Sequence, residues 1–132
     1  YYSISHKNVI RGMHFQTSPV DHEKPVYCSF GGALDVVVDL RKQSPTYKKH
    51  IQVMLNSENA NMLYIPRGCA HGFKALEDNC ILSYKVSTVY NPSHDTGIRW
   101  DSCGIDWRLD NEPIISERDN GFKTLDEFIS PF

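Results

Sequence analysis

Leu34-Asp35-Val36-Val37-Val38-Asp39-Leu40 is the stretch of sequence that decides the fold class. Its apolar, β-branched character is typical of a central strand that is buried on both faces. Asp35 and Asp39 interrupt it, and a buried carboxylate is costly unless it has a partner or faces a polar cavity. A β-barrel with a polar interior satisfies both conditions, so this stretch predicts a barrel and not a helical bundle.

The sequence on either side of this strand has the same character. Short alternating or β-branched runs are separated by turn residues, as in hairpins and meanders. These runs cover residues 8–15, 25–30, 34–40, 50–55, 61–65 and 80–89. One helix is expected, over residues 121–129, with Leu125, Phe128 and Ile129 docking on the barrel. The fold class is therefore all-β, with a short C-terminal helix.

Length and charge limit what the protein does. With 132 residues, of which 40% are hydrophobic, the chain encloses one core, so residues 1–132 are expected to form a single domain. A net charge of −2 gives no general attraction to nucleic acid or to an anionic membrane, so the expected partner is a small molecule. The four cysteines form no CxxC pair, and no signal peptide is recognisable, so we expect free thiols and a cytoplasmic location.

His14 is the leading candidate for a catalytic base. Its ordinary pKa, about 6.5, suits proton abstraction at neutral pH if a carboxylate steadies the imidazole. Asp119, Asp39 and Asp35 are all candidates for that carboxylate. Taken alone, a histidine on a strand is more often a structural group.

Other polar side chains could complete an acid–base site. Tyr84 and Lys85 are neighbours on an expected strand, so only one of them points inward, and an inward tyrosine could donate a proton. Lys24 and Arg11 are the cations best placed to meet an enolate or a phosphate. His71 follows a turn and is surrounded by small residues that would let a ligand approach. Surface charge and ordinary hydrogen bonding are the simpler interpretations of all these residues.

No metal site is expected. Barrels of this kind often bind iron, manganese or zinc through a His-x-His pair and a carboxylate, but no two histidines of this chain are two residues apart. The chain also has no phosphate-binding glycine loop.

Several motifs of the chain have a particular spelling. They are Arg11-Gly12-Met13-His14-Phe15-Gln16, the run from Asp35 to Arg41, Ala70-His71-Gly72-Phe73, Tyr84-Lys85, Gly97-Ile98-Arg99-Trp100-Asp101, Gly104-Ile105-Asp106-Trp107 and Ile115-Ser116-Glu117-Arg118-Asp119. In this spelling and order the chain resembles the dTDP-4-dehydrorhamnose 3,5-epimerase family, and the resemblance extends over nearly every residue from Ser3 to Asp119.

This resemblance implies a cupin-type jelly roll that forms a homodimer and whose active site needs no metal and no cofactor. The implied reaction, in deoxysugar biosynthesis, is epimerisation at C3, at C5 or at both carbons of a nucleotide-linked 4-keto-6-deoxyhexose through an enolate. The implied catalytic residues are His14, Tyr84, Asp119 and Lys24. The implied substrate-binding residues are Arg11, Gln16, His71, Tyr90 and Asp95.

The chain departs from the family in three places. The resemblance implies an N-terminal segment that reaches the dimer partner, and we expect this chain to lack it. Pro25 and Tyr27 stand where leucine and a polar residue are frequent, and Pro25 removes a strand amide donor beside Lys24. These departures leave open whether the nucleotide is dTDP, CDP or GDP and whether one or two centres are inverted.

Three other functions remain in view. A nucleotide-sugar 3,4-ketoisomerase would share the barrel and the proton chemistry but would move the ketone. A non-catalytic module would bind the sugar nucleotide without exchanging protons. A metal-dependent cupin oxygenase is the weakest of the three.

Overall fold

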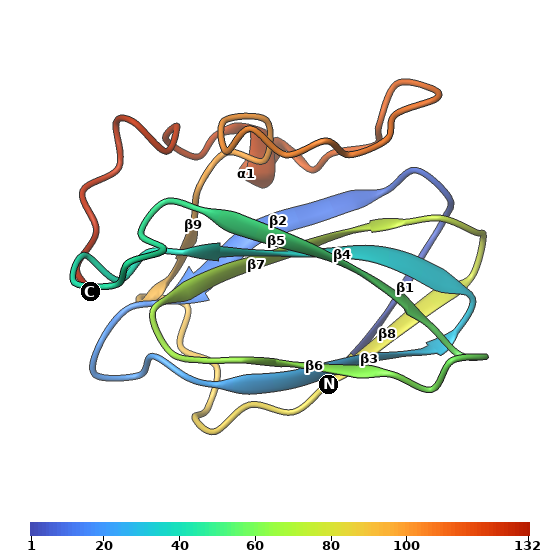
Figure 1. Ribbon diagram of the computed structural model, residues 1–132, viewed down its shortest axis with the longest axis horizontal. Coiled ribbons are helices and arrows are strands. Elements are labelled where there is room, and N and C mark those ends of the chain that lie inside the picture. The colour runs from blue at the N-terminus through green and yellow to red at the C-terminus, as the bar shows by residue number, and fades with distance from the viewer.

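The computed structural model describes residues 1–132 and contains two β-sheets that face each other (Figure 1). The smaller sheet contains, in spatial order, β1 (Tyr2–Ser5), β8 (Cys80–Tyr84), β3 (Lys24–Phe30) and β6 (Met62–Ile65). The larger sheet contains β5 (His50–Asn56), β4 (Gly32–Asp39), β7 (Cys69–Ala75), β2 (Ile10–Gln16) and β9 (Asp95–Gly97). All strand pairs within the sheets are antiparallel, and the chain passes repeatedly from one sheet to the other. The predicted all-β jelly roll is confirmed.

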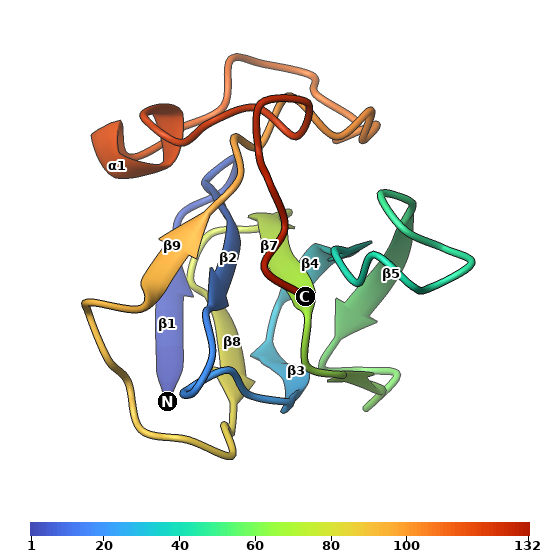
Figure 2. The same cartoon turned by 90° about the vertical axis from the view of Figure 1, so that its left-hand side faces the viewer.

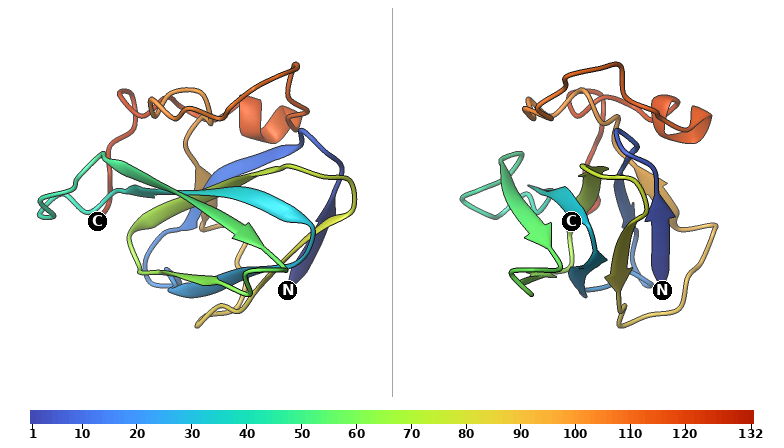
Figure 3. Two further views of the ribbon diagram at one scale, coloured as in Figure 1. Left: turned by 45° about the vertical axis from the view of Figure 1, so that its right-hand side comes forward. Right: turned by 90° about the vertical axis from the view of Figure 1, so that its right-hand side faces the viewer.

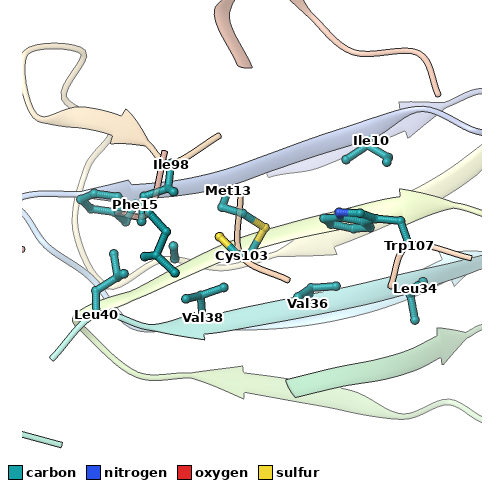
Figure 4. Packing of buried hydrophobic residues seen from close by; sticks show 12 residues of the cluster. Ile10, Met13, Phe15, Leu34, Val36, Val38, Leu40, Ile98, Cys103 and Trp107 are labelled. Atoms are coloured by element: carbon teal, nitrogen blue, oxygen red, sulfur yellow. The ribbon is translucent and has the colours of Figure 1, made fainter. Parts of the chain in front are cut away.

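Strand β4 is buried along its whole length because each of its faces is covered by a different layer. Val37 points between the two sheets, where it joins a cluster that includes Phe73 and Leu82. Val36 points the other way, toward Trp107 in the segment that follows β9 (Figure 4). A fully buried valine or leucine side chain contributes roughly 1.5–3 kcal/mol to folding. The continuous apolar run of β4 is therefore explained by two cores, one on each side of the larger sheet.

The outer core is closed by residues 98–132, drawn orange to red, which run across the larger sheet on the face turned away from the smaller one (Figure 2). The views in Figure 3 show the same arrangement from two other sides. This segment contains the helix α1 (Glu117–Asn120), which Ser116 caps by accepting a hydrogen bond from the Asp119 amide. With only four residues in α1, no helix of the structure is long and apolar enough to cross a membrane.

The prediction of a helix over residues 121–129 is wrong. The helix ends before Gly121, and residues 121–129 form turns and irregular chain. Thr124 and Glu127 form a capping box, and the Phe128 amide donates to the Thr124 carbonyl at 3.0 Å, but this single turn is not continued into a helix. Leu125 is nevertheless buried and Phe128 packs against the outer core, as expected, whereas Ile129 is 88% exposed.

The strand expected over residues 80–89 ends at Tyr84. Pro25 lies on the neighbouring strand at the point where pairing stops, and its carbonyl accepts the Lys85 amide at 3.2 Å. Proline has no N–H to return the bond, so the regular ladder between β3 and β8 ends at this position. Beyond it, only the Ser87 amide still donates to a backbone carbonyl of the neighbouring segment, that of Glu23, at 3.3 Å.

A β-bulge in β2 changes which side chains face the interior. Arg11 pairs with Phe73 and His14 pairs with His71 on β7, so three steps along β2 match two steps along β7. A regular strand would place Arg11 and His14 on opposite faces. The extra residue brings both side chains, together with Gln16, to the same cavity.

Two glycines allow the close contact between β2 and β7 at this bulge. Gly12 has φ of +138°, and a Cβ atom there would lie 2.6 Å from the Gly72 Cα. A Cβ on Gly72 would lie 2.6 Å from the Met13 sulfur and 2.8 Å from the Arg11 carbonyl oxygen. Neither position has room for a side chain.

All four cysteines are buried free thiols, which agrees with the expectation from the sequence. The Cys28 and Cys80 sulfurs are 3.9 Å apart in the core between the sheets. Burial raises the pKa of Cys80 to about 12, so its thiolate is scarce at neutral pH.

We expect Gly72→Ala to lower the free energy of unfolding by about 3 kcal/mol, because the new methyl group overlaps backbone and sulfur atoms of β2. Urea unfolding followed by circular dichroism measures this. Gly32→Ala is the matched control, because a Cβ on Gly32 meets its nearest neighbour at an ordinary 3.5 Å. Equal stability of the two variants would contradict the close packing of the bulge.

Candidate active site

The cavity between the two sheets brings together most of the residues singled out from the sequence. Its volume is about 340 Å³, and both sheets contribute to its walls. The predicted residues that line it are Arg11, His14, Gln16, Lys24, His71, Tyr84, Tyr90 and Asp95. Asp119 alone among the predicted site residues does not line the cavity, because it lies behind His14.

His14 is held by Asp119 of α1, which lies more than 100 residues later in the chain. The His14 Nε2 atom is 2.7 Å from Asp119 Oδ1, and Asp119 Oδ2 accepts the Gly12 amide at 3.0 Å. The Asp119 side chain is 4% exposed, whereas that of His14 is 29% exposed. Burial alone would raise the pKa of Asp119, but the hydrogen bonds from His14 and Gly12 outweigh it and lower this pKa. The carboxylate is therefore ionised at neutral pH.

The other two candidate carboxylates have different partners. Asp35 Oδ2 is 2.8 Å from Nε2 of His71, which makes a second, deeper histidine–carboxylate pair. Burial lowers the pKa of His71 despite the adjacent Asp35, so its imidazole is neutral at physiological pH. Asp39 accepts hydrogen bonds from Arg41, which lies on the surface of the molecule. Geometry thus selects Asp119 as the partner of His14.

Tyr84 lies on the wall opposite His14, because β8 belongs to the smaller sheet and β2 to the larger one. Burial raises the pKa of Tyr84, so the phenol keeps its proton at neutral pH. The Tyr1 ring stacks on it with centroids 5.7 Å apart. Lys85 points to the outer surface, so the expected alternation along this strand is correct.

Lys24 lies over Tyr84, with its ammonium nitrogen 5.9 Å from the centre of the phenol ring. Desolvation lowers the pKa of Lys24 to about 8, although Asp35 and Asp95 act in the opposite direction. A lysine with this pKa is mostly charged at pH 7 and becomes mostly neutral above about pH 8. Arg11 supplies a second cation and donates to the Ser5 hydroxyl at 3.2 Å.

Gln16 and Asp95 line the cavity, but their polar atoms already have protein partners. The Gln16 amide nitrogen donates to the Val20 carbonyl at 2.7 Å, and its oxygen accepts the Asn91 amide at 2.7 Å. The Gln16 amide nitrogen also donates to the Val89 carbonyl at 3.4 Å, so Gln16 holds the chain on either side of Tyr90, which is 55% exposed at the cavity. Asp95 forms an ion pair with Arg118.

The sequence analysis missed several residues of the cavity. Arg118 lines the cavity and immediately precedes Asp119 in the motif of residues 115–119. That motif could have identified Arg118 as a residue of the site. His22 lies between two polar residues, Asp21 and Glu23, and nothing in this local pattern marks it as part of a site. Burial and the nearby Lys24 lower the pKa of His22 to about 4, so it is neutral at physiological pH. Tyr1, Ser3 and Val86 also line the cavity.

No group of three or more His, Cys, Asp or Glu side chains is arranged to hold a metal ion. Of the three histidines that line the cavity, His14 and His71 are each paired with one carboxylate instead, and His22 is not. The absence of a catalytic metal stays a prediction from the sequence.

A jelly roll with a histidine–aspartate pair on one wall, a tyrosine on the other and cations between them defines a cupin-type isomerase. Known proteins identify it more closely. A model of the family described as dTDP-4-dehydrorhamnose 3,5-epimerase matches residues 1–127. The enzyme of that name from Methanothermobacter thermautotrophicus is 46% identical over 95% of this chain and 69% of its own length.

Solved structures agree. The dTDP-4-dehydrorhamnose 3,5-epimerase from Sulfolobus tokodaii has a TM-score of 0.92 at 42% identity, covering 98% of this chain and 72% of its own. The Legionella pneumophila dTDP-6-deoxy-D-glucose-3,5-epimerase, solved with dTDP-4-keto-L-rhamnose, has a TM-score of 0.91 at 35% identity, covering 96% and 68%. The chain belongs to the dTDP-4-dehydrorhamnose 3,5-epimerase family and is an epimerase of the isomerase class.

We expect the extent of Lys24 acetylation by acetic anhydride to rise with pH with a midpoint near 8, because only the neutral amine reacts. Mass spectrometry of the digested protein measures this. Asp95→Asn should move the midpoint lower, because the Asp95 charge raises the pKa of Lys24. A midpoint near the ordinary lysine value, about 10.4, would contradict the desolvated position of this side chain.

Proposed function

We propose that this chain inverts C3 and C5 of a dTDP-linked 4-keto-6-deoxyhexose, with His14 as the base and Tyr84 as the acid. The observation that carries the proposal is the position of the two groups on opposite sheets of one cavity. Inversion at a carbon requires a proton to leave from one face and to return from the other. The relatives named for this reaction and the sugar nucleotide in the Legionella structure support the dTDP-linked substrate.

The His14–Asp119 pair is suited to take a proton from carbon. An ionised Asp119 only accepts hydrogen bonds, so Nε2 of His14 carries the proton between them and Nδ1 holds the free lone pair. Asp119 then stabilises the imidazolium that forms when Nδ1 takes the proton. Protons at C3 and C5 are acidic enough for this step because each carbon is next to the C4 ketone.

Loss of either proton places negative charge on the C4 oxygen, and the charged Lys24 is suited to stabilise this enolate. Tyr84 then donates its proton to the carbon from the opposite face. The same Lys24 lies beside the Tyr84 ring and favours the phenolate that remains. His14 then releases its proton to solvent, and the Tyr84 phenolate takes up a proton from solvent. The cycle therefore consumes no net proton.

The remaining cavity residues are suited to the rest of the substrate. Arg11 and Arg118 are the guanidinium groups of the cavity, and guanidinium binds phosphate oxygens in pairs. Tyr90 has an exposed aromatic face on which a nucleobase could stack. His71 and Asp95 complete the proposed sugar and nucleotide contacts, and Gln16 supports them by holding the chain around Tyr90.

Proton NMR of dTDP-4-keto-6-deoxyglucose with the enzyme in deuterium oxide tests the proposal. We expect both the C3 and the C5 signals to disappear. His14→Ala should slow this exchange by about 10³-fold, the usual contribution of a general base, while Tyr84→Phe should retain exchange and lose the inverted product. His50→Ala and Tyr47→Phe, on residues outside the cavity, are the matched controls and should behave like the wild type.

The other functions give different results in the same experiment. Loss of only one signal would replace the double inversion with a single one, and a 3-keto product would indicate the ketoisomerase. Binding without any exchange would indicate a non-catalytic module. Repeating the measurement with the CDP- and GDP-linked sugars tests the nucleotide.

We also propose that two copies of the chain associate through the outer face of the smaller sheet. Tyr2, Ile4, Met62 and Tyr64 are each more than half exposed on strands β1 and β6. Monomeric proteins seldom leave so many large apolar side chains of one sheet in water. A cytoplasmic location stays a prediction from the sequence.

We expect Tyr64→Asp to convert the proposed dimer to a monomer, because burying an unpaired carboxylate in an apolar interface is costly. Sedimentation equilibrium should give twice the 15.1 kDa chain mass for the wild type and the single mass for the variant. Ile129→Asp is the control, because this residue is even more exposed, at 88% against 63% for Tyr64, but lies outside the sheet. A monomeric wild-type protein would contradict the proposed interface.

A further inference from the structure

Phe122 contacts the proposed base although it lies outside the cavity. It follows Asp119 by three residues in the C-terminal segment and is half-buried. Its ring centroid is 5.9 Å from that of the His14 imidazole, at an interplanar angle of 75°, which is an edge-to-face arrangement. Phe122 lines a separate surface hollow with Thr96 and Gly97.

Gly97 makes room for this contact. It pairs directly with His14 across β2 and β9, so a side chain at position 97 would be the nearest cross-strand neighbour of the imidazole. A Cβ atom on Gly97 would lie only 2.5 Å from a carbon of the Phe122 ring. Phe122 therefore occupies the space that the side chain of an ordinary strand residue would fill.

Phe122 also contacts a residue of the cavity wall. The Arg118 guanidinium carbon is 5.3 Å from the centre of the Phe122 ring, which is within the range of a cation–π contact. Arg118 is held independently by its ion pair with Asp95. The aromatic ring thus lies between the proposed base and a cation that lines the cavity.

We propose that Phe122 is a positioning residue that fixes the orientation of the His14 ring. The inference rests on the proposed role of His14 as the base. The hydrogen bond to Asp119 holds Nε2 but leaves the imidazole plane free to rotate about the line between the two groups. Edge-to-face packing against Phe122 restricts that rotation and keeps Nδ1 directed at the substrate carbon. Misalignment of a base by a fraction of an ångström is enough to slow proton transfer.

Steady-state kinetics of Phe122→Leu tests the inference. We expect kcat to fall about tenfold, since leucine fills the space without the flat aromatic edge. KM should remain within about twofold, because Arg118 keeps its ion pair with Asp95. Phe122→Tyr, which retains the ring, should restore kcat to near the wild-type value.

Phe128→Leu is the matched control. Phe128 lies on the same segment and makes a similar edge-to-face contact, with Phe15 at 5.4 Å and 71°, but it does not contact His14. We expect this variant to lose thermal stability while keeping kcat. An equal loss of kcat in the two leucine variants would mean that Phe122 acts only by holding the segment, and would overturn the inference.

His14→Ala is measured in parallel to separate this inference from the proposed function. If His14→Ala is inactive and Phe122→Leu keeps the wild-type kcat, the inference about Phe122 is wrong and the base assignment stands. If His14→Ala remains active, the base assignment itself is wrong. A tenfold loss that Phe122→Tyr does not restore would also overturn the role of the aromatic ring.

Discussion

The hydrogen bonds of Asp119 connect the two ends of this molecule, and the arrangement of the cavity depends on them. One carboxylate oxygen accepts the Gly12 amide and the other contacts Nε2 of His14, more than 100 residues earlier in the chain. Gly12, whose amide donates to Asp119, lies within the bulge in β2. The same bulge turns Arg11 and His14 toward one cavity. A single buried carboxylate therefore stabilises the irregular backbone and holds the proposed base.

The C-terminal segment, residues 98–132, both closes the outer core and supplies residues to the site. Trp107 and Leu125 cover the outer face of the larger sheet and account for the apolar face of β4 that would otherwise meet water. Between them, the short helix α1 supplies Arg118 and Asp119 to the cavity region. Because the site depends on the same segment that closes the outer core, local loosening of this segment should impair chemistry before the barrel unfolds.

Burial and pairing give the titratable side chains around the cavity different protonation states. Asp119 and His14 form one pair, Asp35 and His71 a deeper one, and Lys24 lies within the field of Asp35 and Asp95. Desolvation lowers the pKa values of Lys24 and His71 and raises that of Tyr84. Neutral His71, protonated Tyr84 and charged Lys24 therefore coexist near pH 7, and the last two are the states that the proposed proton donor and enolate-stabilising cation need.

The sequence by itself determined the fold class, most strand positions and the identity of the groups that surround the cavity. Alternation and β-branching are local properties, and the motif spelling is specific to one family, so both could be read without coordinates. Only the tertiary structure decided that Asp119, and not Asp35 or Asp39, contacts His14, and that His22, Arg118 and Phe122 belong to the region. It also replaced the expected helix over residues 121–129 with turns, and it ended β8 opposite Pro25. These features depend on contacts between residues far apart in the chain, and no local pattern of side chains encodes such distances.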